Sequence, residues 1–216
     1  MTTTTRSAKR TAILEAATKV FLAGGYLGTS VDEIAALSGV SKQTVYKQFG
    51  SKEALFVEIV TNMTDAASSL VHDGARELEA DGDATSYLVE YAYRQLAVVL
   101  TPRIMQLRRL VIGDVARFPD LARALYERGP QRALDALAGL LERLAKRGVL
   151  AIDDPKLAAA HFNWLVMGEP MNRAMLLGDS AIPKPGELHR HAAEAVRVFV
   201  AAYGAGDAPS RRAALS

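Results

Sequence analysis

Apolar residues recur at intervals of three and four along almost the whole chain, and no stretch alternates strictly between apolar and polar residues over the length of a strand. This pattern predicts an all-α protein of about nine helices. The first expected helix covers residues 8–23 and ends at Gly24 and Gly25. One of its faces carries the apolar side chains of Ile13, Ala16, Ala17, Val20 and Phe21.

Short helical segments separated by Gly and Ser come next. Ser30 and the glutamate three residues later have the spacing of a capping box, at the start of a helix that ends at Gly39. Ser41 caps a helix that ends before Gly50, and Ser51 caps another. This head has the size of a helix-turn-helix, in which one helix enters the major groove of DNA while the helix before it braces it.

Longer segments rich in Ala, Leu and Arg make up the rest of the chain. We expect helices over residues 85–100, 103–118, 119–147, 155–177 and 187–203. The third of these should break at Gly129-Pro130, because proline removes a backbone hydrogen bond. The predicted organisation is a disordered tail over 1–7, a helix-turn-helix head over 8–52, a larger helical domain over 53–204 and a flexible tail over 205–216.

The composition narrows the class of protein. Cysteine is absent, which excludes disulfides and thiolate metal sites. No apolar run reaches the roughly 18 residues of a membrane span, and the polar N-terminus has no secretory h-region, so we expect a cytoplasmic protein with no membrane partner. The formal net charge is only +2, so any footprint for nucleic acid must be local.

The helix after Ser41 has a polar face that remains once its apolar residues are buried. This face consists of Lys42, Gln43, Thr44, Tyr46, Lys47 and Gln48. Cations, amides and hydroxyls are the groups that contact phosphates and base edges. A solvated face on a core helix is the alternative, and the spacing alone leaves both interpretations open.

A resemblance to a known family bears on that choice. The matching segments are ILEAA (residues 13–17), Phe21 with Gly24-Gly25-Tyr26, SVDEIA (30–35), SGVSK (38–42), Val45-Tyr46, Phe49 and SKEAL (51–55). Over roughly residues 8 to 60 the chain closely resembles the tetracycline-repressor (TetR, AcrR-like) family. The region around 110–148 is similar to the AefR-like branch. The resemblance implies a homodimeric repressor, less often an activator, that a small hydrophobic effector releases from a palindromic operator on double-stranded DNA.

The resemblance also implies roles for single residues. Thr29, Ser41, Tyr46 and Lys52 would contact phosphates, and residues 42–44 would read base edges. Lys47 and Gln48 stand at positions that vary within the family, whereas Val45 and Phe49 belong to the core. The full set of candidate DNA contacts is Thr29, Ser30, Ser41, Lys42, Gln43, Thr44, Tyr46, Lys47, Gln48 and Lys52.

An apolar pocket in the larger domain is the second expected site. Its candidate lining is Met63, Tyr87, Tyr91, Leu96, Met105, Leu110, Phe118, Tyr126, Trp164 and Met167. As a group these residues offer an apolar surface with a few hydroxyls, which suits a small effector. A filled core is the alternative for any one of them.

The last two helices are the expected dimer interface, since a four-helix bundle across a two-fold axis would bury their apolar stripes. The candidate residues are Phe162, Leu165, Val166, Leu188, Ala192, Ala195, Val196 and Phe199. An intramolecular core is the alternative.

Catalytic chemistry finds little support in the sequence. The four histidines show no metal-binding spacing, and neither a nucleophile elbow nor a phosphate-cradling glycine loop occurs. We therefore expect no cofactor, no metal and no enzymatic activity. The alternatives are a DNA-binding protein without an effector, whose larger domain would be solidly packed, and a helical-bundle enzyme.

Overall fold

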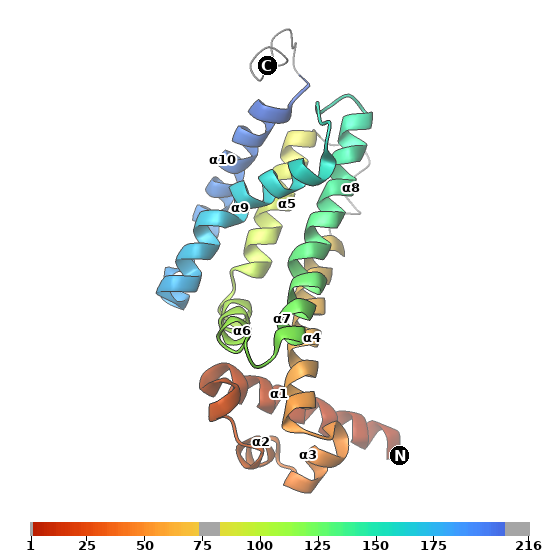
Figure 1. Cartoon of the computed structure of the whole chain (residues 1–216), viewed down its shortest axis with the longest axis vertical. Helices are drawn as coiled ribbons and strands as arrows, with labels where there is room; N and C mark the ends of the chain where they lie inside the picture. The colour runs from red at the N-terminus through yellow and green to blue at the C-terminus, as the bar shows by residue number, and fades with distance from the viewer. Residues whose placement is uncertain (1, 74–82, 206–216) are drawn as a thin grey trace. The chain divides into compact units, whose positions relative to one another are not determined.

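The computed structural model describes residues 2–73 and 83–205, and every helix below is taken from these ranges. The chain forms two compact units. The first contains the residues up to Ala67 together with Pro102–Gly129, and the second contains Ser68–Thr101 together with the residues from Pro130 onward. Between them, the described parts hold helices and a single antiparallel bridge, Leu150 with Gly204, which confirms the all-α prediction (Figure 1).

The first unit is built from six helices. They are α1 (Thr2–Gly28), α2 (Val31–Ser38), α3 (Lys42–Phe49), most of α4 (Lys52–Asp73), α6 (Pro102–Gly113) and α7 (Pro119–Tyr126). The second unit contains α5 (Ala84–Val99), α8 (Arg132–Lys146), α9 (Pro155–Leu177), the 3-10 turn η2 (Asp179–Ala181) and α10 (Pro185–Tyr203). None of the described helices combines the length and hydrophobicity needed to cross a bilayer.

The start of α1 differs from the prediction. Residues 2–7 are helical, whereas the sequence predicts a disordered tail over 1–7. The reason is that no glycine or proline interrupts the chain before residue 24, so the helix extends backwards from its packed part. The predicted stop is correct, because Gly25 has a φ of 70° that interrupts the helical backbone. Residues 206–216 of the predicted C-terminal tail lie outside the described residues.

One further helix end was predicted incorrectly. Helix α6 ends at Gly113, five residues before the predicted end, because a hydrogen-bonded turn leads from Asp114 to Phe118 and α7 restarts with a proline at its first position. The break predicted at Gly129-Pro130 is confirmed, because a π-helical turn, η1 (Glu127–Gln131), interrupts the α-helical backbone between α7 and α8. The wider turn accommodates the missing proline N–H. With α7, η1 and α8 counted as one helix, the described α-helices number nine.

The first unit has a core of aromatic and aliphatic side chains. Phe21 and Phe56 are fully buried with ring centroids 5.0 Å apart, and Tyr26 and Phe118 pack against Phe56 at 5.2 and 5.6 Å. Residues from α6 and α7, including Leu107, Val111 and Leu121, belong to the same core. This packing explains why both helices group with residues 2–67. The predicted division of function at residue 52 stays a prediction.

In the second unit α5, α9 and α10 pack against one another, and α8 packs along α9 (Figure 1). Phe162 of α9 is the centre of this core, with its ring 6.2 Å from Tyr91 and 5.1 Å from Phe199. Pro155 begins α9 with Asp154 as its cap, as the sequence predicts. Each helix of the unit therefore places an apolar stripe inside.

The turn between α2 and α3 depends on Gly39, which has a left-handed φ of 67°. We predict that Gly39→Ala lowers the free energy of unfolding by about 1 kcal/mol, because a Cβ disfavours this conformation although it would meet no neighbouring atom. Chemical denaturation measures the effect. Gly113→Ala is the matched control, since that glycine also has open space around it but no positive φ, and an equal loss in both variants would contradict the prediction.

Candidate functional site

The first turns of α2 and α3 are both closed by serine caps. Ser30 Oγ accepts a hydrogen bond from the Glu33 backbone N–H at 3.1 Å, and Ser41 Oγ accepts one from the Thr44 backbone N–H at 3.2 Å. The two hydroxyls of Ser41 and Thr44 are also hydrogen-bonded, at 2.8 Å. The caps predicted at both serines are confirmed, and they fix the start of α3.

Helix α3 buries only two of its side chains, those of Val45 and Phe49, which belong to the core as predicted. The side chains of Lys42, Gln43, Tyr46 and Lys47 are exposed, and those of Thr44 and Gln48 are half-buried. Tyr46 is 43% exposed, a large fraction for an aromatic residue on so short a helix. The polar face that the sequence predicts is therefore open to solvent and to any partner.

Lys42 is paired with a carboxylate from the preceding helix. Its ammonium donates to Asp32 Oδ2 at 2.9 Å, and this hydrogen bond raises the pKa of the lysine. Both side chains are at least half exposed, so the pair contributes little to stability and can open. A phosphate or a base edge would compete with Asp32 for the ammonium.

Lys52 holds the start of α4 to the segment before α2. Its ammonium donates to the backbone carbonyl of Thr29 at 2.6 Å and lies 4.4 Å from the ring centroid of Tyr26. Burial, and then the charge of Arg117, lower the pKa of Lys52. Two of the three ammonium protons remain for other acceptors, because an ammonium has three donors.

The sequence predicts that Thr29 contacts a phosphate, but its hydroxyl is not exposed for such a contact. Thr29 is 3% exposed, and its hydroxyl donates to the Gly25 carbonyl at 2.8 Å. A phosphate can only accept from a threonine hydroxyl, which has one proton to donate. Because that proton is already used, a Thr29 side-chain contact to DNA would require the local bond to break.

Arg10 is a residue that the sequence analysis missed. Its guanidinium donates to both oxygens of Glu58, at 2.5 and 2.7 Å, and lies 4.4 Å from the ring centroid of Phe49. It thus connects α1, α3 and α4. The three residues are far apart in the chain, and no local spacing marks them as partners.

The pocket candidates fall into two groups of five. Met63, Met105, Leu110, Phe118 and Tyr126 belong to the first unit, and Tyr87, Tyr91, Leu96, Trp164 and Met167 belong to the second. Tyr126 and Trp164 are 51% and 66% exposed, so neither lines an enclosed chamber as it stands, which corrects the prediction for these two. The other eight are buried or half-buried.

Seven of the eight predicted interface residues are buried inside the second unit. Phe162, Val166, Ala192, Val196 and Phe199 have no exposed surface, and Leu188 and Ala195 have almost none. Only Leu165 reaches the surface, at 37% exposure. The prediction is wrong for the seven, because these stripes of α9 and α10 form the core of the second unit, and the sequence alone does not show whether an apolar stripe packs within the chain or against a second copy.

The exposed apolar face of α9 is a different set. It contains Leu157, Trp164, Leu165 and Leu176, which recur at helical intervals and are between 37% and 75% exposed. We call these four residues the outer α9 face. Several exposed apolar side chains on one face of a helix are candidates for an interface with another protein.

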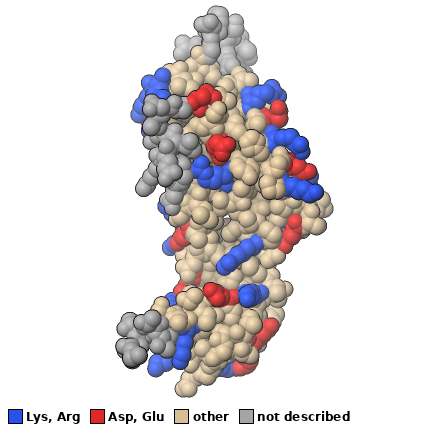
Figure 2. Space-filling view, turned by 180° about the vertical axis from the view of Figure 1, so that it is seen from behind, with Lys and Arg blue, Asp and Glu red and all other residues tan. Residues whose placement is uncertain are grey.

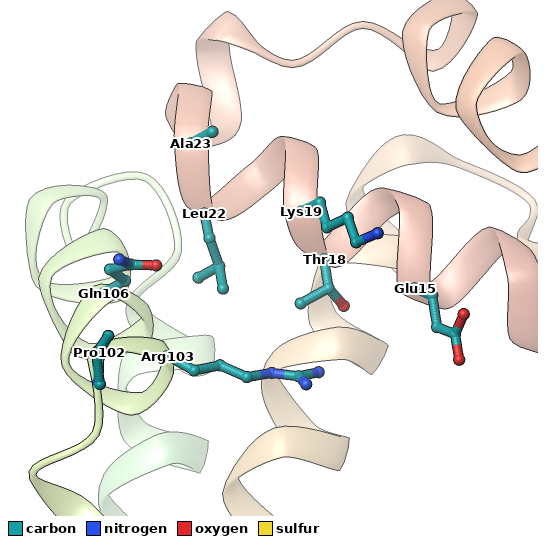
Figure 3. Close-up of a pocket in the computed structure, with 8 residues that line it drawn as sticks. All are labelled: Glu15, Thr18, Lys19, Leu22, Ala23, Pro102, Arg103 and Gln106. Atoms are coloured by element: carbon teal, nitrogen blue, oxygen red, sulfur yellow. The ribbon is translucent and has the colours of Figure 1, made fainter.

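A groove of about 640 Å³ lies between α1 and α6 in the first unit. Figure 3 shows Thr18 and Leu22 pointing from α1 toward Arg103 of α6. The full lining is Glu15, Thr18, Lys19, Leu22, Ala23, Pro102, Arg103 and Gln106. None of the ten pocket candidates is among them.

Charge is mixed on the surface. Figure 2 shows Lys and Arg interspersed with Asp and Glu on the visible face. Within the ranges that the structure describes, no three His, Asp or Glu side chains gather in a group that could hold a metal ion.

Two family models match the chain. The model of bacterial regulatory proteins of the tetR family matches residues 13–59, which include α2 and α3. The model of the C-terminal domain of AefR-like transcriptional repressors matches residues 86–205.

Similar proteins match most of the chain. The chain is 38% identical to a TetR-family transcriptional regulator from Mesorhizobium loti, over 92% of this chain and 98% of that one, with a TM-score of 0.85. It is 31% identical to the flavonoid-responsive regulator FrrA, over 91% and 97% of the two chains, with a TM-score of 0.70. The HTH-type transcriptional regulator YhgD of Bacillus subtilis is 27% identical, over 77% of this chain and 89% of that protein.

The cap at Ser41 should stabilise the first turn of α3. We predict that Ser41→Ala lowers the free energy of unfolding by about 1 kcal/mol, because the Thr44 N–H loses its acceptor. Ser41→Asp should retain the wild-type stability, since a carboxylate is an equally good cap. Urea denaturation of both variants measures this, and equal losses would show that the cap does not stabilise the helix.

Proposed function

The chain belongs to the TetR family of bacterial transcriptional regulators, and we propose that it is a homodimeric repressor that a small hydrophobic effector releases from a palindromic operator. It is a DNA-binding regulator with a helix-turn-helix. The repressor assignment is supported by the match of residues 86–205 to AefR-like repressors. We further propose that it acts in the cytoplasm and catalyses no reaction, as its relatives are regulators.

The exposed polar face of α3 is the observation that carries the proposal. Its cations, amides and hydroxyls stand on a helix whose first turn is capped and whose two apolar side chains are fixed in a core. Such a helix can lie in the major groove without losing internal packing. In our proposal residues 42–44 read base edges, while Ser30, Ser41 and Tyr46 hold phosphates.

One proposed phosphate contact, Lys52, also has a structural role. Lys52 positions α4 through Thr29 and would give its remaining ammonium protons to the DNA backbone. Lys47 and Gln48 lie later on α3, where Lys47 is exposed and Gln48 is half-buried. Lys47 is therefore better placed than Gln48 to contact DNA at the edge of the major groove.

Release would require coupling between the DNA site and an effector site. Half-sites one helical turn apart need recognition helices about 34–36 Å from each other, so a small movement lowers affinity. A coupling of about 1–3 kcal/mol changes affinity roughly 5- to 150-fold. Helix α4 is the proposed link, since it follows α3 directly and contributes residues to both compact units.

An effector is supported by one relative in particular. FrrA is named as a flavonoid-responsive regulator, and its resemblance covers 91% of this chain. By analogy we propose that a small, mainly apolar molecule binds in the larger domain. The rival is a regulator without an effector, which the tight burial of most pocket candidates favours.

We propose that the outer α9 face forms the dimer interface. Leu176 is 75% exposed and Trp164 66%, and burial of such side chains is favourable by about 25 cal/mol for each Å² removed from water. Val198 of α10, at 42% exposure, would extend this surface. An isologous contact across a two-fold axis would bury the same residues of both copies.

Selection of duplexes from a random DNA library with the purified protein tests DNA recognition. We expect a palindromic consensus, and Tyr46→Phe should weaken binding to it and to its variants by about tenfold alike, because the hydroxyl contacts a phosphate. Tyr126→Phe is the matched control, as that tyrosine is also exposed but lies outside α2 and α3. Failure to enrich any sequence would refute operator binding.

Gln43 should behave differently from Tyr46. Because an amide can bind adenine with two hydrogen bonds, Gln43→Ala should change the ranking of operator variants and cost about 1–3 kcal/mol at one base pair. Competition between the consensus and its single-base variants measures this. An unchanged ranking would exclude Gln43 as a reader of sequence.

Sedimentation analysis of Trp164→Glu tests the interface. We expect the wild type to be a dimer and the variant a monomer, because the two-fold axis would bring two carboxylates into an apolar contact. Ile112→Glu is the control, since Ile112 is 57% exposed on α6 and belongs to the first unit, whereas the proposed interface belongs to the second. A variant that sediments as the wild type does would place the interface elsewhere.

A further inference from the structure

Helix α5 carries a cluster of buried polar atoms without partners. They are Tyr91 Oη, Arg94 Nη1 and Gln95 Oε1, and none of these three atoms is hydrogen-bonded within the described parts of the chain. Tyr91 is 3% exposed and Gln95 5% exposed. Residues three and four apart are neighbours on one helix face, so the three side chains project from the same turn of α5.

The surroundings of the cluster are apolar and aromatic. The Tyr91 ring packs against Phe162 with centroids 6.2 Å apart, and Leu88 and Ala92 of the same helix have no exposed surface. Gln95 Nε2 donates to Asn163 Oδ1 at 2.9 Å, which fixes the orientation of the amide and leaves its oxygen as a free acceptor. All of these residues belong to the second unit.

Each group in the cluster has a defined hydrogen-bonding character. Burial raises the pKa of Tyr91, so the phenol keeps its proton and donates. Arg94 is a permanent cation with donors only. The cluster thus offers two donors, one of them charged, and one acceptor.

Buried polar groups almost always have partners, and an unpaired one destabilises the fold. A water molecule can satisfy a phenol or an amide. An anion can accept from Tyr91 Oη and from the buried Nη1 of the half-buried Arg94, and it also pairs with the charge of the guanidinium. Three such atoms on one helical turn, without a partner in the described parts of the chain, would therefore be satisfied by a molecule from outside it.

We propose that the effector is a hydroxyaryl carboxylic acid, an inference that rests on the proposed effector-controlled function. Its carboxylate accepts hydrogen bonds from Arg94 and Tyr91, and its hydroxyl donates to Gln95 Oε1. The ring packs beside Phe162. The effector class is thereby narrowed from hydrophobic to aromatic and acidic.

Calorimetric titration of the DNA-free, full-length protein tests this. The probes are 4-hydroxybenzoate, 4-hydroxycinnamate and 6-hydroxy-2-naphthoate, each with its methyl ester. At least one acid should bind about tenfold or more tightly than its ester, because the ester has no charge for Arg94. If no acid binds, or if acids and esters bind alike, the proposal is overturned.

Arg94→Met should remove the preference for the acid over its ester, and the exposed Arg190→Met on α10 should leave it unchanged. An acid preference that persists in Arg94→Met would overturn the assignment. Tyr91→Phe provides a readout that needs no ligand. Because it removes an unpaired hydroxyl, its melting temperature should equal or exceed that of the wild type, whereas a clear loss would show that the hydroxyl has a partner within the chain.

The test distinguishes this inference from the proposed repressor function. An acid that binds through Arg94 but does not release the selected operator duplex supports the ligand assignment and contradicts release. Conversely, release by the methyl esters alone would support an effector-controlled regulator and overturn the proposed chemistry of its ligand.

Discussion

The structure of the first unit depends on the contact between Phe21 of α1 and Phe56 of α4, because α2 and α3 pack against the core around these two rings. Helices α2 and α3 have eight residues each, and isolated helices shorter than about 12–15 residues are marginal in water. Their stability comes from tertiary packing, through the few apolar side chains that they contribute to the core around those two rings. Val45 and Phe49 fix the rotation of α3, and this rotation decides which of its residues face outward.

Cations near the head serve packing as well as recognition. Arg10 and Lys52 lie over the rings of Phe49 and Tyr26, and each also binds an oxygen of another element. These side chains hold the two ends of the head to its core. The positive charge available to DNA is correspondingly limited, which fits a net charge of +2 and gives the polar residues of α3 more weight in recognition.

Helix α9 of the second unit has apolar residues on two sides. One side supplies Phe162 and Val166 to the core with α5 and α10, and the outer α9 face is left apolar and exposed. The same core contains the unpaired groups of Tyr91, Arg94 and Gln95. The proposed dimer would cover the outer α9 face, and the proposed acidic aromatic effector would pair with the polar groups of α5.

The sequence by itself determined the helical class, the caps at Ser30 and Ser41, the burial of Val45 and Phe49, and the family. These features depend on spacings of a few residues, in which backbone geometry connects pattern to structure directly. Tertiary structure alone decided that Thr29 is buried, that Arg10 bridges three helices, and which side of α9 turns inward. It also decided which polar groups of α5 lack partners. Such features depend on contacts between distant segments, and a local pattern does not contain the identity of a partner that lies 48 residues away, as Glu58 does from Arg10.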